Sequence, residues 1–191
     1  MKPCDKKALR RAIRQAFPGD AERLRQSECI CGHVLAWGDY QKAGMIGGYM
    51  PMSHEADITG ILLDALKGGK TLVLPRCGTP PAMTFHRVNS LDELVSGAYG
   101  LMEPKADAPL VSPAEVDLLL VPLEAVDSHG MRLGKGGGYY DRLLSEYEIN
   151  TLGVALEHQV VQALDTDAWD RPLKAAVTCR GVECFELERT V

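Results

Sequence analysis

The run DLLLV at residues 117–121 is apolar at every position after its first, and it restricts the fold more than any other segment. A strand with one face in water alternates apolar and polar side chains, whereas an unbroken apolar run is typical of a strand buried on both faces. Other apolar strand segments lie along the chain, and segments with helical spacing alternate with them. This alternation predicts one α/β layered domain, covering residues 1–191, with a mainly parallel sheet.

Capping and stop residues set the boundaries of the expected helices. Asp5 can cap a helix over 6–17, which Pro18 and Gly19 end. Further helices are expected over 20–31, 57–67 and 139–147. Strands are expected over 33–39, 45–50, 71–75, 83–88, 117–121, 151–156 and 175–178. The segment 103–115 contains three prolines and is expected to be a surface loop.

Composition and charge exclude several classes of protein. The net charge of −5 does not favour general nucleic-acid binding, and no apolar run approaches the roughly 20 residues of a membrane span. The six cysteines form no C-x-x-C pair, so we expect reduced thiols rather than a zinc site or a disulfide framework. Residues 1–17 are basic and amphipathic like a mitochondrial presequence, but Asp5 and the following helix argue against one. We expect a cytoplasmic protein without nucleic-acid or membrane partners.

The sequence RLGKGGGYYDRLL at 132–144 places four glycines within five positions, directly before an expected helix. Glycines permit positive φ and close approach of a ligand, and a helix start offers free N–H groups and a positive dipole end. After the buried strand, such a loop is expected to cradle phosphate, with the Lys135 charge inside it. The common nucleotide motifs do not fit, since Tyr139 stands at the third glycine of G-x-G-x-x-G. The alternative is a mobile turn with a solvent-facing lysine.

Basic residues follow one face of the first expected helix. Lys6, Arg10 and Arg14 are spaced at i, i+4 and i+8, and Lys7 and Arg11 form a parallel row. Like charges at this spacing repel one another and weaken the helix. A bound polyanion such as a triphosphate would turn this repulsion into attraction. The alternative is a basic face that water solvates.

Four segments occur in a characteristic order: KKALR at 6–10, YMPMSHEADI at 49–58, TLVLPR at 71–76 and RLGKGGGYYDRLL at 132–144. In order and spacing they resemble the 5-formyltetrahydrofolate cyclo-ligase family, also called methenyltetrahydrofolate synthetase. The resemblance implies a three-layer α/β/α fold of the type shared with ribose-phosphate isomerase and CoA-transferase relatives. It also implies that ATP and Mg²⁺ drive cyclisation of 5-formyltetrahydrofolate to 5,10-methenyltetrahydrofolate through a phosphorylated formyl group, with release of ADP and phosphate.

The resemblance implies roles for particular residues. ATP binding is implied for a basic pair and the glycine loop: Lys6, Arg10, Arg132, Leu133, Gly134, Lys135, Gly136, Gly137, Gly138, Tyr139 and Tyr140. Mg²⁺ binding is implied for Asp141 and Asp170, folate binding for Met50, Glu55 and Tyr139, and catalysis for Lys135 and Tyr140. The chain has Trp169 before Asp170, where the bacterial pattern is often His-Asp. The two tyrosines have core packing at a helix start as their alternative.

Other residues have simpler expectations. The histidines at 54, 86, 129 and 158 lack metal-ligand spacing and are expected at the surface or in loops. Trp37 and Trp169 are expected to pack rather than to stack on a ligand. Arg76 would contact phosphate or the folate glutamate tail, or else lie on the surface.

Two other functions stay open beside the cyclo-ligase interpretation. One is a catalytically inactive regulatory protein that binds folate or nucleotide, and the other is a sugar-phosphate isomerase-like enzyme that needs no ATP. Each of the three would bind small-molecule ligands, and we expect a monomer.

Overall fold

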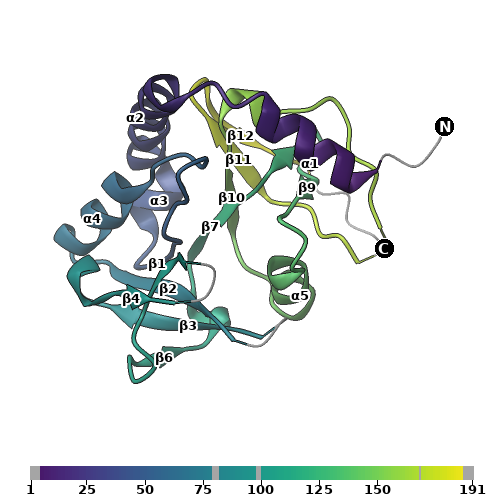
Figure 1. Ribbon diagram of the computed structural model, residues 1–191. Coiled ribbons are helices and arrows are strands. Elements are labelled where there is room, and N and C mark those ends of the chain that lie inside the picture. Colours follow the sequence, from purple (N-terminus) through teal and green to yellow (C-terminus); the bar gives the residue numbers. More distant parts are fainter. Residues whose placement is uncertain (1–4, 79–81, 98–99, 168, 187–191) are drawn as a thin grey trace.

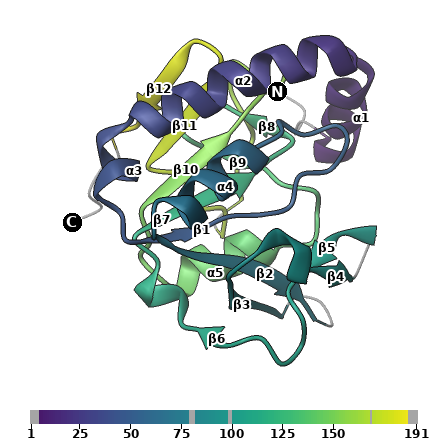
Figure 2. The ribbon, with the colours of Figure 1, turned by 90° about the vertical axis from the view of Figure 1, so that its left-hand side faces the viewer.

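An eight-stranded sheet forms the middle layer of the protein (Figures 1 and 2). The computed structural model describes residues 5–78, 82–97, 100–167 and 169–186. The strand order is β12 (Gly181–Cys184), β11 (Ala175–Thr178), β10 (Thr151–Val154), β7 (Leu118–Pro122), β1 (Met45–Gly47), β2 (Thr71–Cys77), β3 (Met83–Val88) and β6 (Leu110–Val111). The strands from β11 to β2 run parallel, and β12, β3 and β6 are antiparallel to their neighbours. The mainly parallel sheet is confirmed.

Helices cover both faces of this sheet. The helices α2 (Asp20–Ala36), α3 (Gly38–Lys42) and α4 (Thr59–Lys67) pack on one face, and α5 (Tyr139–Glu146) packs on the other (Figure 1). The first helix, α1 (Lys6–Gln15), begins after Asp5, whose side chain accepts a hydrogen bond from the Lys7 amide as its cap. It packs through Ile13 against the ribbon of β8 (Ala125–Val126) and β9 (Arg132–Leu133). This arrangement is the three-layer α/β/α fold.

The central strand β7 is buried on both faces, as its apolar run predicted. Leu118 and Leu120 belong to the core cluster shared with α2, α3 and α4. Leu119 and Val121 belong to the opposite cluster, which contains Leu143 of α5. Because successive side chains of a strand point to opposite faces, an unbroken apolar run supplies both layers of the core.

The expected strand at 33–39 is wrong. Helix α2 continues through Gly32 to Ala36, and α3 begins at Gly38. Ile30 and Val34 lie one helical turn apart and are both fully buried, so the continued helix places both in the core. This packing outweighs the low helix propensity of glycine.

Two connecting segments differ from the sequence prediction: the one between β7 and α5, and residues 103–115. The glycine loop does not follow β7 directly, because the β8–β9 ribbon intervenes. The segment 103–115 is not only a loop, since β6 joins the sheet beside β3, and β4 (Val95–Ser96) pairs with β5 (Met102–Glu103) in a ribbon. Short 3₁₀ helices span Leu91–Glu93, Pro113–Glu115 and Glu157–Gln159.

One of the four histidines is also placed differently from its prediction. His86 is buried in β3 rather than exposed, and its ring bonds to the Thr84 hydroxyl and the Ala108 carbonyl. These two contacts satisfy both ring nitrogens, which allows the imidazole to be buried in the sheet.

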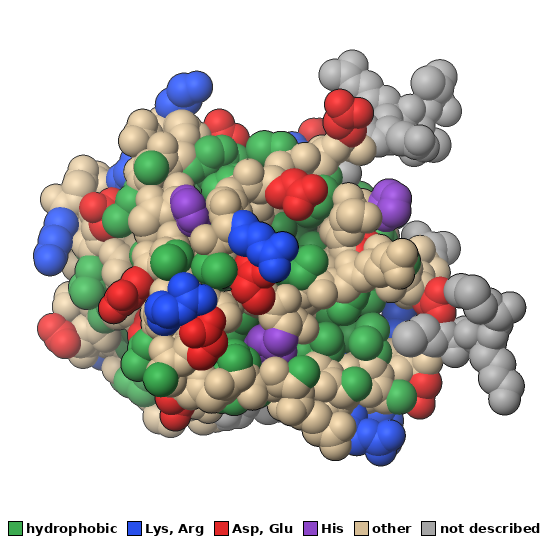
Figure 3. All heavy atoms as spheres, turned by 90° about the horizontal axis from the view of Figure 1, so that it is seen from above, with side chains coloured by type: hydrophobic (Ala, Val, Ile, Leu, Met, Phe, Trp, Pro, Cys, Tyr) green, Lys and Arg blue, Asp and Glu red, His purple; other side chains and the backbone are tan. Residues whose placement is uncertain are grey.

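Charges of both signs are interspersed on the face seen from above in Figure 3. Charges of opposite sign also pair within α2, where Arg25 and Glu22 lie 2.6 Å apart. None of the helices in the described ranges has the length and apolarity needed to cross a membrane.

Candidate active site

A cavity of about 600 Å³ lies beyond the carboxyl ends of the central strands. Its wall includes Tyr49 and Met50 after β1, Pro75 late in β2, and Pro122 at the end of β7. Strand β1 ends at Gly47, earlier than expected, so the chain from Tyr49 onward is free to line this space. Ligands of open α/β sheets bind at this edge, and the cavity lies where the sequence predicted the binding site.

The glycine loop forms one wall of the cavity, and the guanidinium of Arg10 lies beside this loop. Gly136 and Gly138 have φ of 101° and 68°, a region that other L-residues adopt only with strain. Gly138 is the last residue before α5, so the loop ends at a helix start. Arg10 of α1 donates from Nε to the Gly134 carbonyl at 2.7 Å, which fixes α1 to the loop.

Lys6 of α1 joins two carboxylates at the mouth of the cavity. Its Nζ lies 2.7 Å from Asp167 Oδ2 and 2.7 Å from Asp170 Oδ2. Burial opposes the charged form of Asp170, but hydrogen bonds from the Asp167 amide and Lys6 outweigh it, and the pKa of Asp170 lies below its ordinary value. Asp170 is therefore an anion at neutral pH.

Arg132 and Asp141 form a second ion pair in the same region. The Arg132 side chain is only 2% exposed, and its Nη1 lies 2.7 Å from Asp141 Oδ1. Burial lowers the pKa of Arg132, and the charges of Asp141 and Asp170 act in the opposite direction. The carboxylates of Asp141 and Asp170 therefore both stabilise the charged form of the buried Arg132 guanidinium.

These carboxylates have the chemistry of a magnesium site completed by a substrate. Among the described residues, no group of three or more His, Cys, Asp or Glu side chains is arranged to hold a metal ion. Mg²⁺ usually takes one or two protein carboxylates, with waters and substrate phosphates as its other ligands. Asp141 and Asp170 line the same cavity and fit that donor set.

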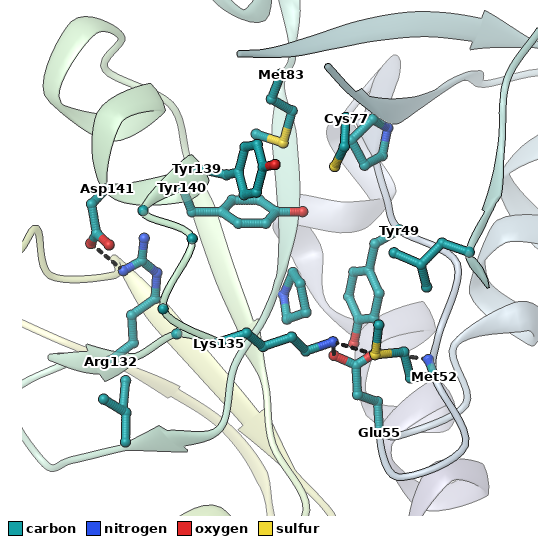
Figure 4. A pocket seen from close by; sticks show the side chains of 18 of the residues that line it. Tyr49, Met52, Glu55, Cys77, Met83, Arg132, Lys135, Tyr139, Tyr140 and Asp141 are labelled. Atoms are coloured by element: carbon teal, nitrogen blue, oxygen red, sulfur yellow. Dashed lines mark hydrogen bonds and ion pairs between the residues drawn. The ribbon is translucent and has the colours of Figure 1, made fainter. Parts of the chain in front are cut away.

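Lys135 does not lie inside the loop as expected. Its Nζ reaches across the cavity to Glu55 Oε1 at 2.6 Å and to Met52 Sδ at 2.9 Å (Figure 4). The other oxygen of Glu55 accepts from the Met52 amide at 2.7 Å. Lys135 therefore connects the glycine loop to the segment after β1.

Aromatic and sulfur-containing side chains surround the other end of the cavity. Figure 4 shows Tyr139, Tyr140, Met83 and Cys77 around the same space as Tyr49. Burial raises the pKa of Tyr140 and of Tyr49 well above the ordinary phenol value, and the charge of Glu55 adds to this. Both hydroxyls are protonated at neutral pH and can donate hydrogen bonds.

The structure brings together every residue to which the family resemblance gave a role. The cavity wall contains Lys6, Arg10, Met50, Glu55, Arg132, Leu133, Gly134, Lys135, Gly136, Gly137, Gly138, Tyr139, Tyr140, Asp141 and Asp170. The basic face of α1 is nevertheless divided, because Arg14 turns away and pairs with buried Glu124 at 2.8 Å. Lys7 and Arg11 are exposed.

Several wall residues were not foreseen, notably Asp167, Glu103 and Trp169. Trp169 is 65% exposed at the cavity, so its predicted packing role is wrong, whereas Trp37 packs against the core as predicted. Arg76 is not part of the wall and donates to the Pro104 carbonyl at 2.7 Å. Asp167 and Trp169 lie in an irregular segment and Glu103 lies in a two-residue strand, and periodicity carries no signal in either.

Comparison with known proteins gives a consistent result. The model of the 5-formyltetrahydrofolate cyclo-ligase family matches residues 4–179. The chain is 34% identical over 176 residues to 5-formyltetrahydrofolate cyclo-ligase of Escherichia coli K12, covering 89% of this chain and 96% of the relative. It is 28% identical over 180 residues to the mouse protein of the same name, covering 86% and 89%.

Solved structures agree with these sequence relatives. The NMR structure of Aquifex aeolicus 5,10-methenyltetrahydrofolate synthetase matches with a TM-score of 0.86 at 34% identity, covering 97% of this chain and 95% of that chain. A Mycoplasma pneumoniae 5,10-methenyltetrahydrofolate synthetase shares the fold, with a TM-score of 0.75 at 23% identity, covering 92% and 99%. Since the family match spans most of the chain and the relatives cover it nearly end to end, the protein belongs to the 5-formyltetrahydrofolate cyclo-ligase family.

Proposed function

We propose that this enzyme uses ATP and Mg²⁺ to cyclise 5-formyltetrahydrofolate to 5,10-methenyltetrahydrofolate, releasing ADP and phosphate. The observation that carries the proposal is that one cavity has a charged end and an aromatic end, with Lys135 between them. The charged end contains Lys6, Arg10 and the glycine loop, and the aromatic end contains Tyr49 and Tyr140. A reaction that joins a nucleotide triphosphate to a bicyclic ring needs both kinds of surface in contact.

The chemistry requires activation of a poor electrophile. The formyl oxygen attacks the γ-phosphorus of ATP, the bond to the β–γ bridging oxygen breaks, and ADP leaves. The resulting imidate phosphate has a good leaving group, so N10 attacks its carbon, the proton on N10 is lost and phosphate departs. Phosphoryl transfer of this kind depends on positioning and charge neutralisation more than on covalent help from the protein.

We assign the phosphate groups to the charged end of the cavity. The cations of Lys6 and Arg10 and the amides of the glycine loop would bind the triphosphate. Arg132, buried beside the loop, would hold Asp141 in place. Asp141 and Asp170 would hold Mg²⁺, which neutralises phosphate charge when it is bound.

We assign the folate to the aromatic end. Met50, Glu55 and Tyr139 would contact the folate, and the Tyr140 hydroxyl, which stays protonated, would donate to the reacting oxygen. Lys135 stands between the two ends and would stabilise the negative charge that develops during transfer. The whole cavity is built from one chain, so we propose that the enzyme acts as a monomer.

One assay separates the three candidate functions. The protein is mixed with 5-formyltetrahydrofolate and MgATP, and methenyl absorbance is followed in the near ultraviolet together with released phosphate. A cyclo-ligase gives both signals in equal amounts, and only when both substrates are present. A regulatory binding protein gives binding heat in a calorimeter but no product. A sugar-phosphate isomerase-like enzyme gives neither product nor binding of 5-formyltetrahydrofolate. Absence of product with wild-type protein would contradict the proposal, whether or not 5-formyltetrahydrofolate binds.

A further inference from the structure

Glu103 is a buried acid in the apolar part of the cavity, and the proposed mechanism does not use it. Its side chain is only 4% exposed, yet it belongs to the cavity wall. The same wall contains several apolar or sulfur-containing side chains: Leu74, Cys77, Leu101 and Met102. Burying a carboxylate among such groups is unfavourable unless donors satisfy its oxygens.

The protein itself satisfies this carboxylate only weakly. Among the described residues, the Cys77 amide lies 3.3 Å from Oε1 and the Arg76 guanidinium lies 4.0 Å from Oε2. Glu55 in the same cavity differs, since both of its oxygens have partners within 2.7 Å. Of the two glutamates in the described cavity wall, Glu103 therefore has the more distant protein partners, and its carboxylate can accept further hydrogen bonds.

The position of the Glu103 side chain is fixed by its surroundings. Its backbone pairs with Val95 in the β4–β5 ribbon, and its side chain lies directly over Gly97. A Cβ at Gly97 would overlap the carboxylate, so glycine leaves the space that the side chain fills. The acid is thus held in one orientation beside the cavity.

We propose that Glu103 determines specificity by accepting hydrogen bonds from the substrate's amino-pyrimidinone edge. This inference rests on the proposed function and names the contact for the bicyclic ring. The ring has two adjacent N–H donors, the 2-amino group and N3–H, which match the two oxygens of one carboxylate. Its flat faces match the apolar and aromatic side chains of the cavity wall.

The test is a thermodynamic cycle that combines one protein variant with one altered ligand and compares the four binding affinities. Calorimetry measures the affinity of wild type and Glu103→Gln for 5-formyltetrahydrofolate and for its 2-desamino analogue. We expect Glu103→Gln to bind the parent compound about 10- to 100-fold more weakly, because a charge-assisted hydrogen bond is lost. The analogue should bind wild type weakly, and the variant should no longer distinguish it from the parent. Affinity for MgATP should not change.

Two further variants complete the design. Gly97→Ala keeps the acid but displaces it, so it should weaken folate binding in the same direction. Glu183→Gln is the matched control, since this glutamate is exposed on the edge strand β12. If Glu103→Gln still penalises loss of the 2-amino group as strongly as wild type does, the inference is wrong while the cyclo-ligase function stands. If wild type binds no 5-formyltetrahydrofolate, both fail.

Discussion

The ion pair between Lys135 and Glu55 can be measured as an interaction energy. The two charged atoms are 2.6 Å apart, and Glu55 is buried while Lys135 is one-third exposed. Coulomb's law gives about 1.5–6 kcal/mol at this distance for effective dielectric constants from 80 to 20. Water reaches the lysine and desolvation opposes the attraction, so we expect a net coupling of about 1–2 kcal/mol.

A double-mutant cycle isolates this coupling. Urea unfolding is followed for wild type, Lys135→Met, Glu55→Gln and the double variant. Lys135→Met leaves a buried carboxylate without its cation, so it should lower the free energy of unfolding by about 1–3 kcal/mol. The double variant should recover part of this loss, because the uncompensated charge is then gone. Additivity within about 0.5 kcal/mol would show that the pair does not stabilise the fold.

The same variants separate the structural role of this pair from its proposed catalytic role. If Lys135 stabilises the transferred phosphoryl group, Lys135→Met should lower kcat/KM by about 10²–10³, the range found for removal of one transition-state donor. Lys135→Arg keeps the charge and should retain more activity than Lys135→Met. Kinetics that follow only the thermal stability of the variants would refute the catalytic role and leave Lys135 as a structural contact.

Three other expectations concern residues around the cavity. Asp141→Asn should raise the Mg²⁺ concentration needed for half-maximal turnover without unfolding the protein, and Asp170→Asn should act in the same direction. If the Mg²⁺ titration of the Asp141 variant is unchanged, Asp141 serves only to hold Arg132. Glu124→Gln removes the buried partner of Arg14, which anchors α1, so the KM for ATP should rise several-fold while the KM for folate stays constant. Burial lowers the pKa of His158 despite the charge of Glu124, so His158 binds a proton less readily in the folded protein than in the unfolded chain. The free energy of unfolding should therefore be highest above about pH 6.5 and should decline as the pH falls. Urea titrations at several pH values should show a smaller decline for His158→Gln.

The sequence predicted those parts of the fold whose side chains follow a local pattern. The strand 117–121 and the helix capped by Asp5 could be identified because burial and capping leave a signature within a few residues. The end of α2 could not, since the helix passes Gly32 to place Val34 in a core that other segments complete. The short strand β5 was missed because pairing with β4, rather than its own two residues, defines it.

The composition of the site was easier to predict than its contacts. The motif around the glycine loop nominated residues that share one cavity, but it gave no reason to expect Lys135 on Glu55. Side-chain direction across a cavity depends on what the opposite wall offers, and this information lies about 80 residues away in the chain. Trp169 and Glu103 have no local signature for the same reason.

The pairing of Lys6 with Asp170 joins positions 164 residues apart, and it has a consequence for the order in which the protein becomes active during synthesis. A nascent chain emerges from its N-terminus, so α1 is available long before the segment that carries Asp167 and Asp170. Until that segment leaves the ribosome, Lys6 has neither carboxylate as a partner. An incomplete chain therefore lacks this side of the cavity, and the activity proposed for the cavity cannot begin before the fold is finished.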